Sequence, residues 1–132
     1  MHSYKEYGFS FFIGGDVVEV GNGSEGQATF KTEVGYLQFV KKKPVGALEI
    51  LNSHQLATDL VLQTKGNLQM LDSGDYLVLY GPIDADYDQK HMVACYLHQF
   101  GDSVWTITCS NTVEAFHWAA IVDLFTSVNF YK

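Results

Sequence analysis

Apolar and polar side chains alternate with a period of two along much of this 132-residue chain. In the segment 28–34, Ala28 and Phe30 share one side while Thr29 and Lys31 share the other. Successive side chains of a β-strand point to opposite faces of the sheet, so this period predicts a half-buried strand. Further segments of extended character lie at 9–13, 16–20, 36–40, 45–51, 76–80, 91–100, 104–110 and 127–131. We therefore expect one antiparallel sheet of five to seven strands.

The clearest hairpin joins the segments 91–100 and 104–110 around Gly101-Asp102-Ser103. If Phe100 lies opposite Val104, Cys95 pairs with Cys109, and one register satisfies the whole apolar pattern. We expect the two thiols to be adjacent, buried and free. The residues that this register places on one inner face are Val93, Cys95, Leu97, Trp105, Ile107 and Cys109.

A second hairpin is expected where the segments 36–40 and 45–51 flank Lys41-Lys42-Lys43-Pro44. We interpret the lysine run as a solvated turn and not as a binding patch. The inner face of this hairpin is expected to carry Leu37, Phe39, Leu48 and Ile50.

Two helices are expected to pack on the sheet. Ser53 is a suitable N-cap for a helix over 54–65, with Leu56 and Leu60 on one face, although 60–62 also suits a strand. Gly66-Asn67 provides a stop for this helix.

The last helix is expected to begin at Asn111. Glu114 follows three residues later, which is the spacing of a capping box. Apolar residues then recur at helical spacing, and this amphipathic face is formed by Val113, Phe116, Ala120, Ile121 and Leu124.

The composition indicates one α+β domain over residues 1–132, with 47% hydrophobic residues available for a core. The net charge is −7, and the chain contains no arginine. An acidic chain without arginine is a poor ligand for nucleic acid or anionic lipid. The sequence begins without the features of a secretory signal, so we expect a cytoplasmic protein.

The segment Asp84-Ala85-Asp86-Tyr87-Asp88 has the alternating carboxylates that open a calcium loop. Its sixth position is Gln89 instead of the turn glycine, and its twelfth is Cys95 instead of the bidentate glutamate. We interpret the segment as a polar turn between strands, with a weak cation site as the alternative.

The histidines and cysteines lack the close pairing that zinc sites require. His98 is expected on the face of its strand opposite Cys95, because the two are three residues apart. We therefore expect no metal site, no cofactor and no catalytic residue. The residues considered for such sites are His91, Cys95, His98, Cys109 and His117.

Aromatic side chains suggest where a partner binds. We expect one sheet face to carry Tyr76, Tyr80, Tyr96 and Phe100, and the other to carry Leu77, Leu79, Val93 and Leu97. Both faces are then apolar, which fits either a sheet covered by helices on each side or one face left as a binding surface. The candidate binding residues are Tyr80, Tyr96, His98 and Phe100.

The chain also resembles a known superfamily. The residues that carry the resemblance are Gly8-Phe9-Ser10-Phe11 near the start, and Trp105 to Ser110 with Phe125 to Phe130 near the end. In this order of elements the chain is similar to the Mog1/PsbP-like superfamily, whose members are α/β/α sandwiches around an antiparallel sheet. The resemblance implies a non-enzymatic role in binding a partner.

We therefore expect a protein-interaction or adaptor module whose partner is a protein. One alternative is an acidic inhibitor or immunity-type protein that masks a basic partner. Another is a small-ligand-binding domain or hydrolase with a pocket near His98 and His117.

Overall fold

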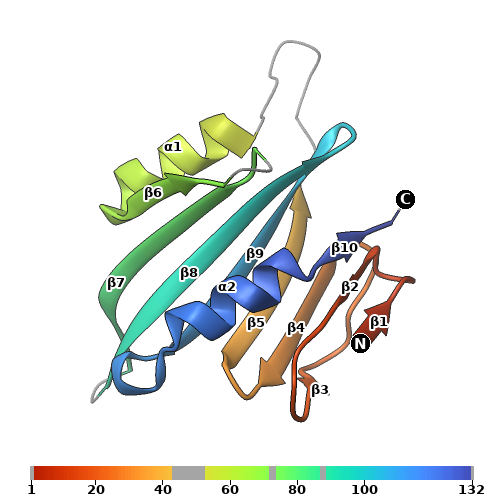
Figure 1. Cartoon of the computed structure of the whole chain (residues 1–132), viewed down its shortest axis with the longest axis horizontal. Coiled ribbons are helices and arrows are strands. Elements are labelled where there is room, and N and C mark those ends of the chain that lie inside the picture. Colours follow the sequence, from red (N-terminus) through yellow and green to blue (C-terminus); the bar gives the residue numbers. More distant parts are fainter. Residues whose placement is uncertain (1, 43–52, 72–73, 87–88, 132) are drawn as a thin grey trace.

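The computed structural model describes residues 2–42, 53–71, 74–86 and 89–131. Its main element is a seven-stranded sheet in which every described pairing is antiparallel, so the expected α+β class is confirmed (Figure 1). In spatial order its strands are β3 (Val18–Glu19), β4 (Gln27–Thr32), β5 (Gly35–Lys42), β9 (Ser103–Thr112), β8 (Gln89–Phe100), β7 (Tyr76–Asp86) and β6 (Asn67–Met70).

A second sheet of three short strands joins the two ends of the chain. Its order is β1 (His2–Tyr4), β2 (Phe9–Phe11) and β10 (Asn129–Phe130). The expected strands at 9–13 and 127–131 are therefore present but shorter. They belong to this small sheet and not to the large one.

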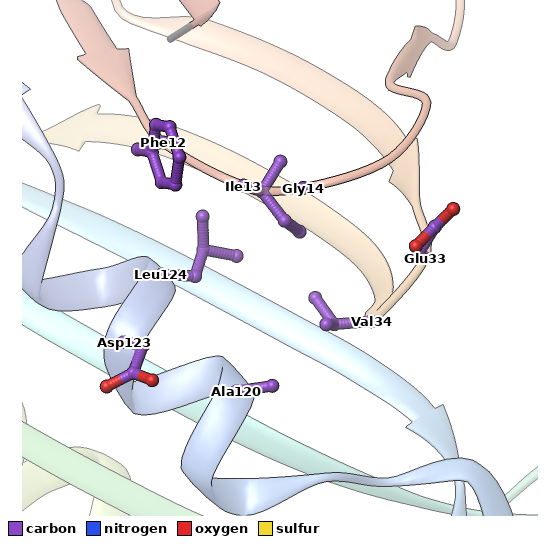
Figure 2. Close-up of a pocket in the computed structure, with 8 residues that line it drawn as sticks. All are labelled: Phe12, Ile13, Gly14, Glu33, Val34, Ala120, Asp123 and Leu124. Carbon is purple, nitrogen blue, oxygen red and sulfur yellow. The ribbon is translucent and has the colours of Figure 1, made fainter.

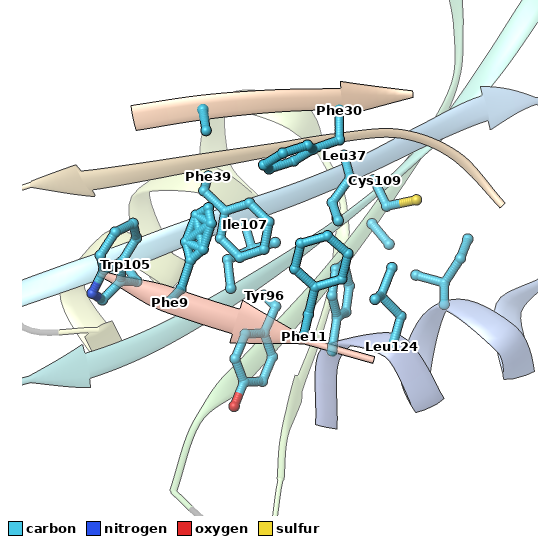
Figure 3. Close-up of a cluster of buried hydrophobic side chains, with 14 of the residues drawn as sticks. Phe9, Phe11, Phe30, Leu37, Phe39, Tyr96, Trp105, Ile107, Cys109 and Leu124 are labelled. Atoms are coloured by element: carbon cyan, nitrogen blue, oxygen red, sulfur yellow. The ribbon is translucent and has the colours of Figure 1, made fainter. Parts of the chain in front are cut away.

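One face of the large sheet packs against the small sheet and the helix α2 (Trp118–Thr126). The core between them is rich in aromatic rings (Figure 3). Phe9 of β2 stacks on Phe39 of β5 with ring centroids 3.8 Å apart, and its ring meets the indole of Trp105 edge-on. These contacts join the small sheet to the large one.

The helix α1 (Ser53–Thr64) covers part of the opposite face, over β7 and β8. Ala57 is fully buried there, and Leu56 and Leu60 pack beside it as their spacing predicted. The helix ends at Thr64, where Lys65 takes a positive φ of 54°. The expected helix over 54–65 is confirmed, and both faces of the sheet carry a helix.

The expected register of the β8–β9 hairpin is wrong by one residue. Phe100 lies opposite Ser103, because the turn has two residues and Gly101 provides the positive φ of 64° that such a tight turn needs. A shift of one residue moves a strand's side chains to the other face. Cys95 therefore lies opposite Thr108, in the core under α1, while Cys109 lies in the aromatic core.

The expected start of the last helix is also wrong. Asn111 belongs to β9, which continues to Thr112 and is followed by a 3₁₀ turn (η1, Val113–Ala115). The Asn111 amide donates to the backbone oxygens of Val34 and Ala115, so it does not cap a helix. The helix α2 begins at Trp118, and its buried residues are Ile121, Leu124 and Phe125.

The bounds of several other strands and turns differ from those expected. Lys41 and Lys42 continue β5 and do not form a turn, while the expected strand over 45–51 lies outside the described residues. The strand β6 is an addition that the sequence analysis missed. Residues 84–86, expected as part of a turn, belong to β7, and β8 starts at Gln89, while residues 87–88 lie outside the described residues. Within the described ranges, no helix is long and apolar enough to cross a membrane.

Candidate functional site

A cavity of about 260 Å³ opens where three parts of the chain meet beside α2. The segment after β2 forms one wall, the β4–β5 turn a second, and α2 the third (Figure 2). The residues that line it are Phe12, Ile13, Gly14, Glu33, Val34, Ala120, Asp123 and Leu124.

Hydrogen bonds join two walls of this cavity. The backbone N–H of Phe12 donates to the Ser127 hydroxyl oxygen at 2.9 Å. The Ser127 hydroxyl lies within hydrogen-bond distance of the backbone oxygens of Phe12 and Leu124. The chain beside Phe12 is thereby tied to the C-terminal end of α2, which defines the opening between them.

The third wall approaches the first through a glycine. Gly15 has a φ of 84°, and a Cβ atom at this position would lie 2.1 Å from the carboxyl carbon of Glu33. A positive φ of this size favours glycine, and the missing Cβ atom leaves room for the Glu33 carboxylate beside the backbone. Gly15 therefore lets the segment after β2 pass close to the exposed side chain of Glu33.

The cavity combines an apolar interior with acidic ends. Phe12 leaves 59% of its surface exposed, although it is a large aromatic residue. Figure 2 shows Glu33 and Asp123 on opposite sides of the apolar side chains. None of the lining residues is basic. Such a site suits an apolar group that carries positive charge.

The structure does not bring the four sequence-predicted binding residues together. In the β7–β8 pairing, Tyr80 lies opposite Val93 and Leu77 lies opposite Tyr96. The expectation that Tyr76, Tyr80, Tyr96 and Phe100 share one face is therefore wrong. Tyr80 packs beside the core under α1, whereas Tyr96, His98 and Phe100 face the side of α2 and the small sheet.

Tyr96 is buried, so it is not the exposed aromatic anchor that the sequence suggested. Only 6% of its surface is accessible, and its hydroxyl donates to the buried carboxylate of Asp75. Burial raises the pKa of Tyr96 well above its usual value, and the hydrogen bond and charge of Asp75 act in the same direction. This pair was missed because the two residues are distant in sequence.

His98 completes this cluster. Its Nδ1 lies 2.8 Å from an oxygen of Asp75, and its ring stacks on Phe130 with centroids 4.4 Å apart. His117 precedes α2 near the other end of the hairpin, since Thr112 pairs with His91. His91 and His98 are separated by roughly 23 Å of strand at ~3.3 Å per residue. The two strand ends that lead to His98 and His117 are thus far apart, and the pocket expected near both residues stays a prediction.

Both cysteines are buried, as expected, but they lie on opposite faces of the sheet. Burial raises the pKa of each thiol to about 12. Neither thiol has the lowered pKa of a nucleophilic cysteine. Among the described residues, no group of three histidines, cysteines or carboxylates is placed to hold a metal ion.

Phe12, Glu33 and Asp123 were not among the site residues predicted from the sequence. Phe12 offered a signal, because it breaks the alternation of Phe9, Ser10 and Phe11 with an aromatic residue on the outer side. Glu33 and Asp123 offered none, because only the packing of α2 beside the β4–β5 turn brings them to one cavity.

The sequence matches no protein-family model and no curated protein.

Proposed function

We propose that this chain is a non-catalytic protein-interaction module that binds a basic segment of a protein partner at the cavity beside α2. The observation that carries the proposal is the combination of exposed Phe12, an apolar interior, and the carboxylates of Glu33 and Asp123. The partner would place an apolar side chain, or the aliphatic part of a lysine or arginine, against Phe12.

The proposed binding mode uses two features that are common in protein interfaces. Aromatic anchors in small pockets contribute most of the binding energy, while charges at the rim steer association. The net charge of −7 attracts a basic partner over distances of about one Debye length, ~8 Å at physiological salt. An inhibitor that masks a basic protein is one form of this function.

We also propose that the fold is of the Mog1/PsbP-like type. The support is a helix on each face of an antiparallel sheet, together with the Gly8-Phe9-Ser10-Phe11 strand near the start. A fold of this type agrees with a binding role.

The test is a selection of random heptapeptides displayed on phage against the purified protein. Enriched peptides are expected to carry lysine or arginine beside an apolar residue. Phe12→Ala should weaken binding of a synthetic enriched peptide by about tenfold or more, which corresponds to ~1.4 kcal/mol. Glu33→Gln and Asp123→Asn should weaken it mainly at low salt.

Two matched controls separate the cavity from general surface effects. Tyr36→Ala removes an aromatic side chain of similar exposure, 50% against 59% for Phe12, and Glu25→Gln removes an exposed carboxylate. Both residues lie outside the cavity lining. Neither should change the affinity. Equal binding by Phe12→Ala and the wild-type protein would reject the site.

The second candidate function is a small-molecule hydrolase, and the Asp75–His98 contact is the observation that favours it. A carboxylate on Nδ1 orients an imidazole so that Nε2 can act as a base. The candidate predicts that the pure protein cleaves an activated ester such as p-nitrophenyl acetate and that His98→Ala abolishes the activity. A small-ligand binder instead predicts a compound that raises the melting temperature.

A further inference from the structure

The strand β6 (Asn67–Met70) forms one edge of the large sheet (Figure 1). Within the described part of the chain it pairs with β7 alone. An edge strand presents unpaired backbone N–H and C=O groups, and these can pair with a strand from another chain. All four residues of β6 are exposed.

Exposed apolar side chains gather in this part of the sequence. Leu62 near the end of α1 is 75% exposed, Leu68 is 43% exposed and Met70 is 65% exposed. Leu68 and Met70 lie two residues apart on the strand, so both point to the α1 face of the sheet. Clustered exposure of this kind marks an interaction site more often than scattered single residues do.

Three of the features that protect edge strands are missing from the four residues of β6. Proteins block such edges with lysine, proline or a bulge. The sequence of β6 is Asn67-Leu68-Gln69-Met70, which contains neither charge nor proline, and its four pairs with β7 run without a register shift. The opposite edge of the sheet differs, because β3 is only two residues long.

We propose that β6 pairs antiparallel with β6 of a second copy of this chain, across a two-fold axis through Gln69. Residues directly opposite in a sheet point to the same face, so a two-fold pairing must join residues whose numbers have an even sum. With Gln69 opposite itself, Leu68 of each copy lies opposite Met70 of the other. Each copy thus provides the apolar complement that the other needs.

A second cavity lies beside β6 and offers a signal for association. It measures about 250 Å³ and opens on the other face of β6, with Trp118 of α2 in its wall. Three residues of β6 (Asn67, Leu68 and Gln69) line it together with Leu77 and Leu79. A strand added beside β6 closes this side of the cavity, so association should change the surroundings of the Trp118 indole.

Charge distinguishes a second copy from a basic partner. Two copies with a net charge of −7 repel each other at long range, although β6 itself is uncharged. Salt screens this repulsion, so association of the copies should strengthen as salt rises. Binding of a basic segment at the cavity beside Phe12 should weaken under the same change. The opposite salt dependences therefore test the two proposals separately.

The test is sedimentation velocity of the full chain over about 1–500 µM at low and moderate salt. A dimer is expected to grow with concentration and with salt, together with a shift in tryptophan emission. Leu68→Lys and Met70→Lys should each weaken the dimer at least tenfold. Val18→Lys is the matched control, because Val18 is an exposed apolar residue on the opposite edge strand, β3. It should leave the dimer unchanged.

Cross-linking tests the register independently of those variants. Gln69→Cys should give a covalent dimer under mild oxidation, because the two-fold axis places the new thiol beside its own copy. The wild-type protein should not cross-link, since Cys95 and Cys109 are buried. A chain that stays monomeric at every concentration and salt overturns the proposal, as does a dimer unaffected by Leu68→Lys. A dimer that forms without cross-linking through Gln69→Cys rejects this register.

Discussion

Replacing Phe9 by alanine is the sharpest test of how the two sheets are joined. Phe9 is fully buried, and its ring contacts Phe39, Phe30 and Trp105 of the large sheet. Its strand has only three residues, so backbone pairing alone holds the small sheet weakly. The ring of Phe9 should therefore provide much of the attachment.

The expected loss follows from the burial. Truncating a buried phenylalanine to alanine costs about 3–5 kcal/mol, because apolar area is lost and a cavity remains. The stack on Phe39 places the cost toward the upper part of this range, since aromatic pairs add ~0.5–1.5 kcal/mol. With an m-value of about 2 kcal/mol per molar urea, a loss of ~4 kcal/mol lowers the unfolding midpoint by about 2 M.

Urea unfolding followed by circular dichroism measures this shift. Phe12→Ala is the matched control, because it removes the same ring from an exposed position three residues away and should cost under about 0.5 kcal/mol. A cost below about 1 kcal/mol for Phe9→Ala would refute the packing argument. Equal costs for the two variants would show that the inner and outer sides of this segment are assigned wrongly.

Two further predictions concern buried ionisable groups. With a pKa of about 12, the thiolate fraction of each of Cys95 and Cys109 is only ~10⁻⁴ at pH 8. A disulfide reagent should therefore modify the folded protein far more slowly than the unfolded protein. Fast labelling of either cysteine in the folded protein would contradict its burial. The pKa of Tyr96 is raised in the folded state, so its stabilising effect is complete below the unfolded pKa of ~10 and is lost as pH rises beyond it. The free energy of unfolding, measured with urea between pH 8 and 11, should therefore fall less steeply for Tyr96→Phe. The difference in slope should reach up to about 1.4 kcal/mol per pH unit above pH ~10, and parallel profiles would exclude Tyr96 as its source.

The alternating pattern predicted most of the strands because it reports burial residue by residue. Leu37 and Phe39 are fully buried on the face where the pattern placed them. The helix α1 was predictable for the same reason, since Leu56 and Leu60 repeat at helical spacing. For the candidate site, only the outward position of Phe12 had a signal in the sequence.

Local pattern and tertiary structure decided different properties of this protein. The sequence by itself determined most of the extended segments and the helix α1, because these depend on side chains close along the chain, but it missed β6 and placed the start of the last helix inside β9. It could not determine which side chains meet. A two-residue turn at Gly101 in place of three residues moved Cys95 and Cys109 to opposite faces. The buried Asp75–Tyr96 contact and the cavity beside Phe12 also join distant segments, and only the packing of those segments creates them.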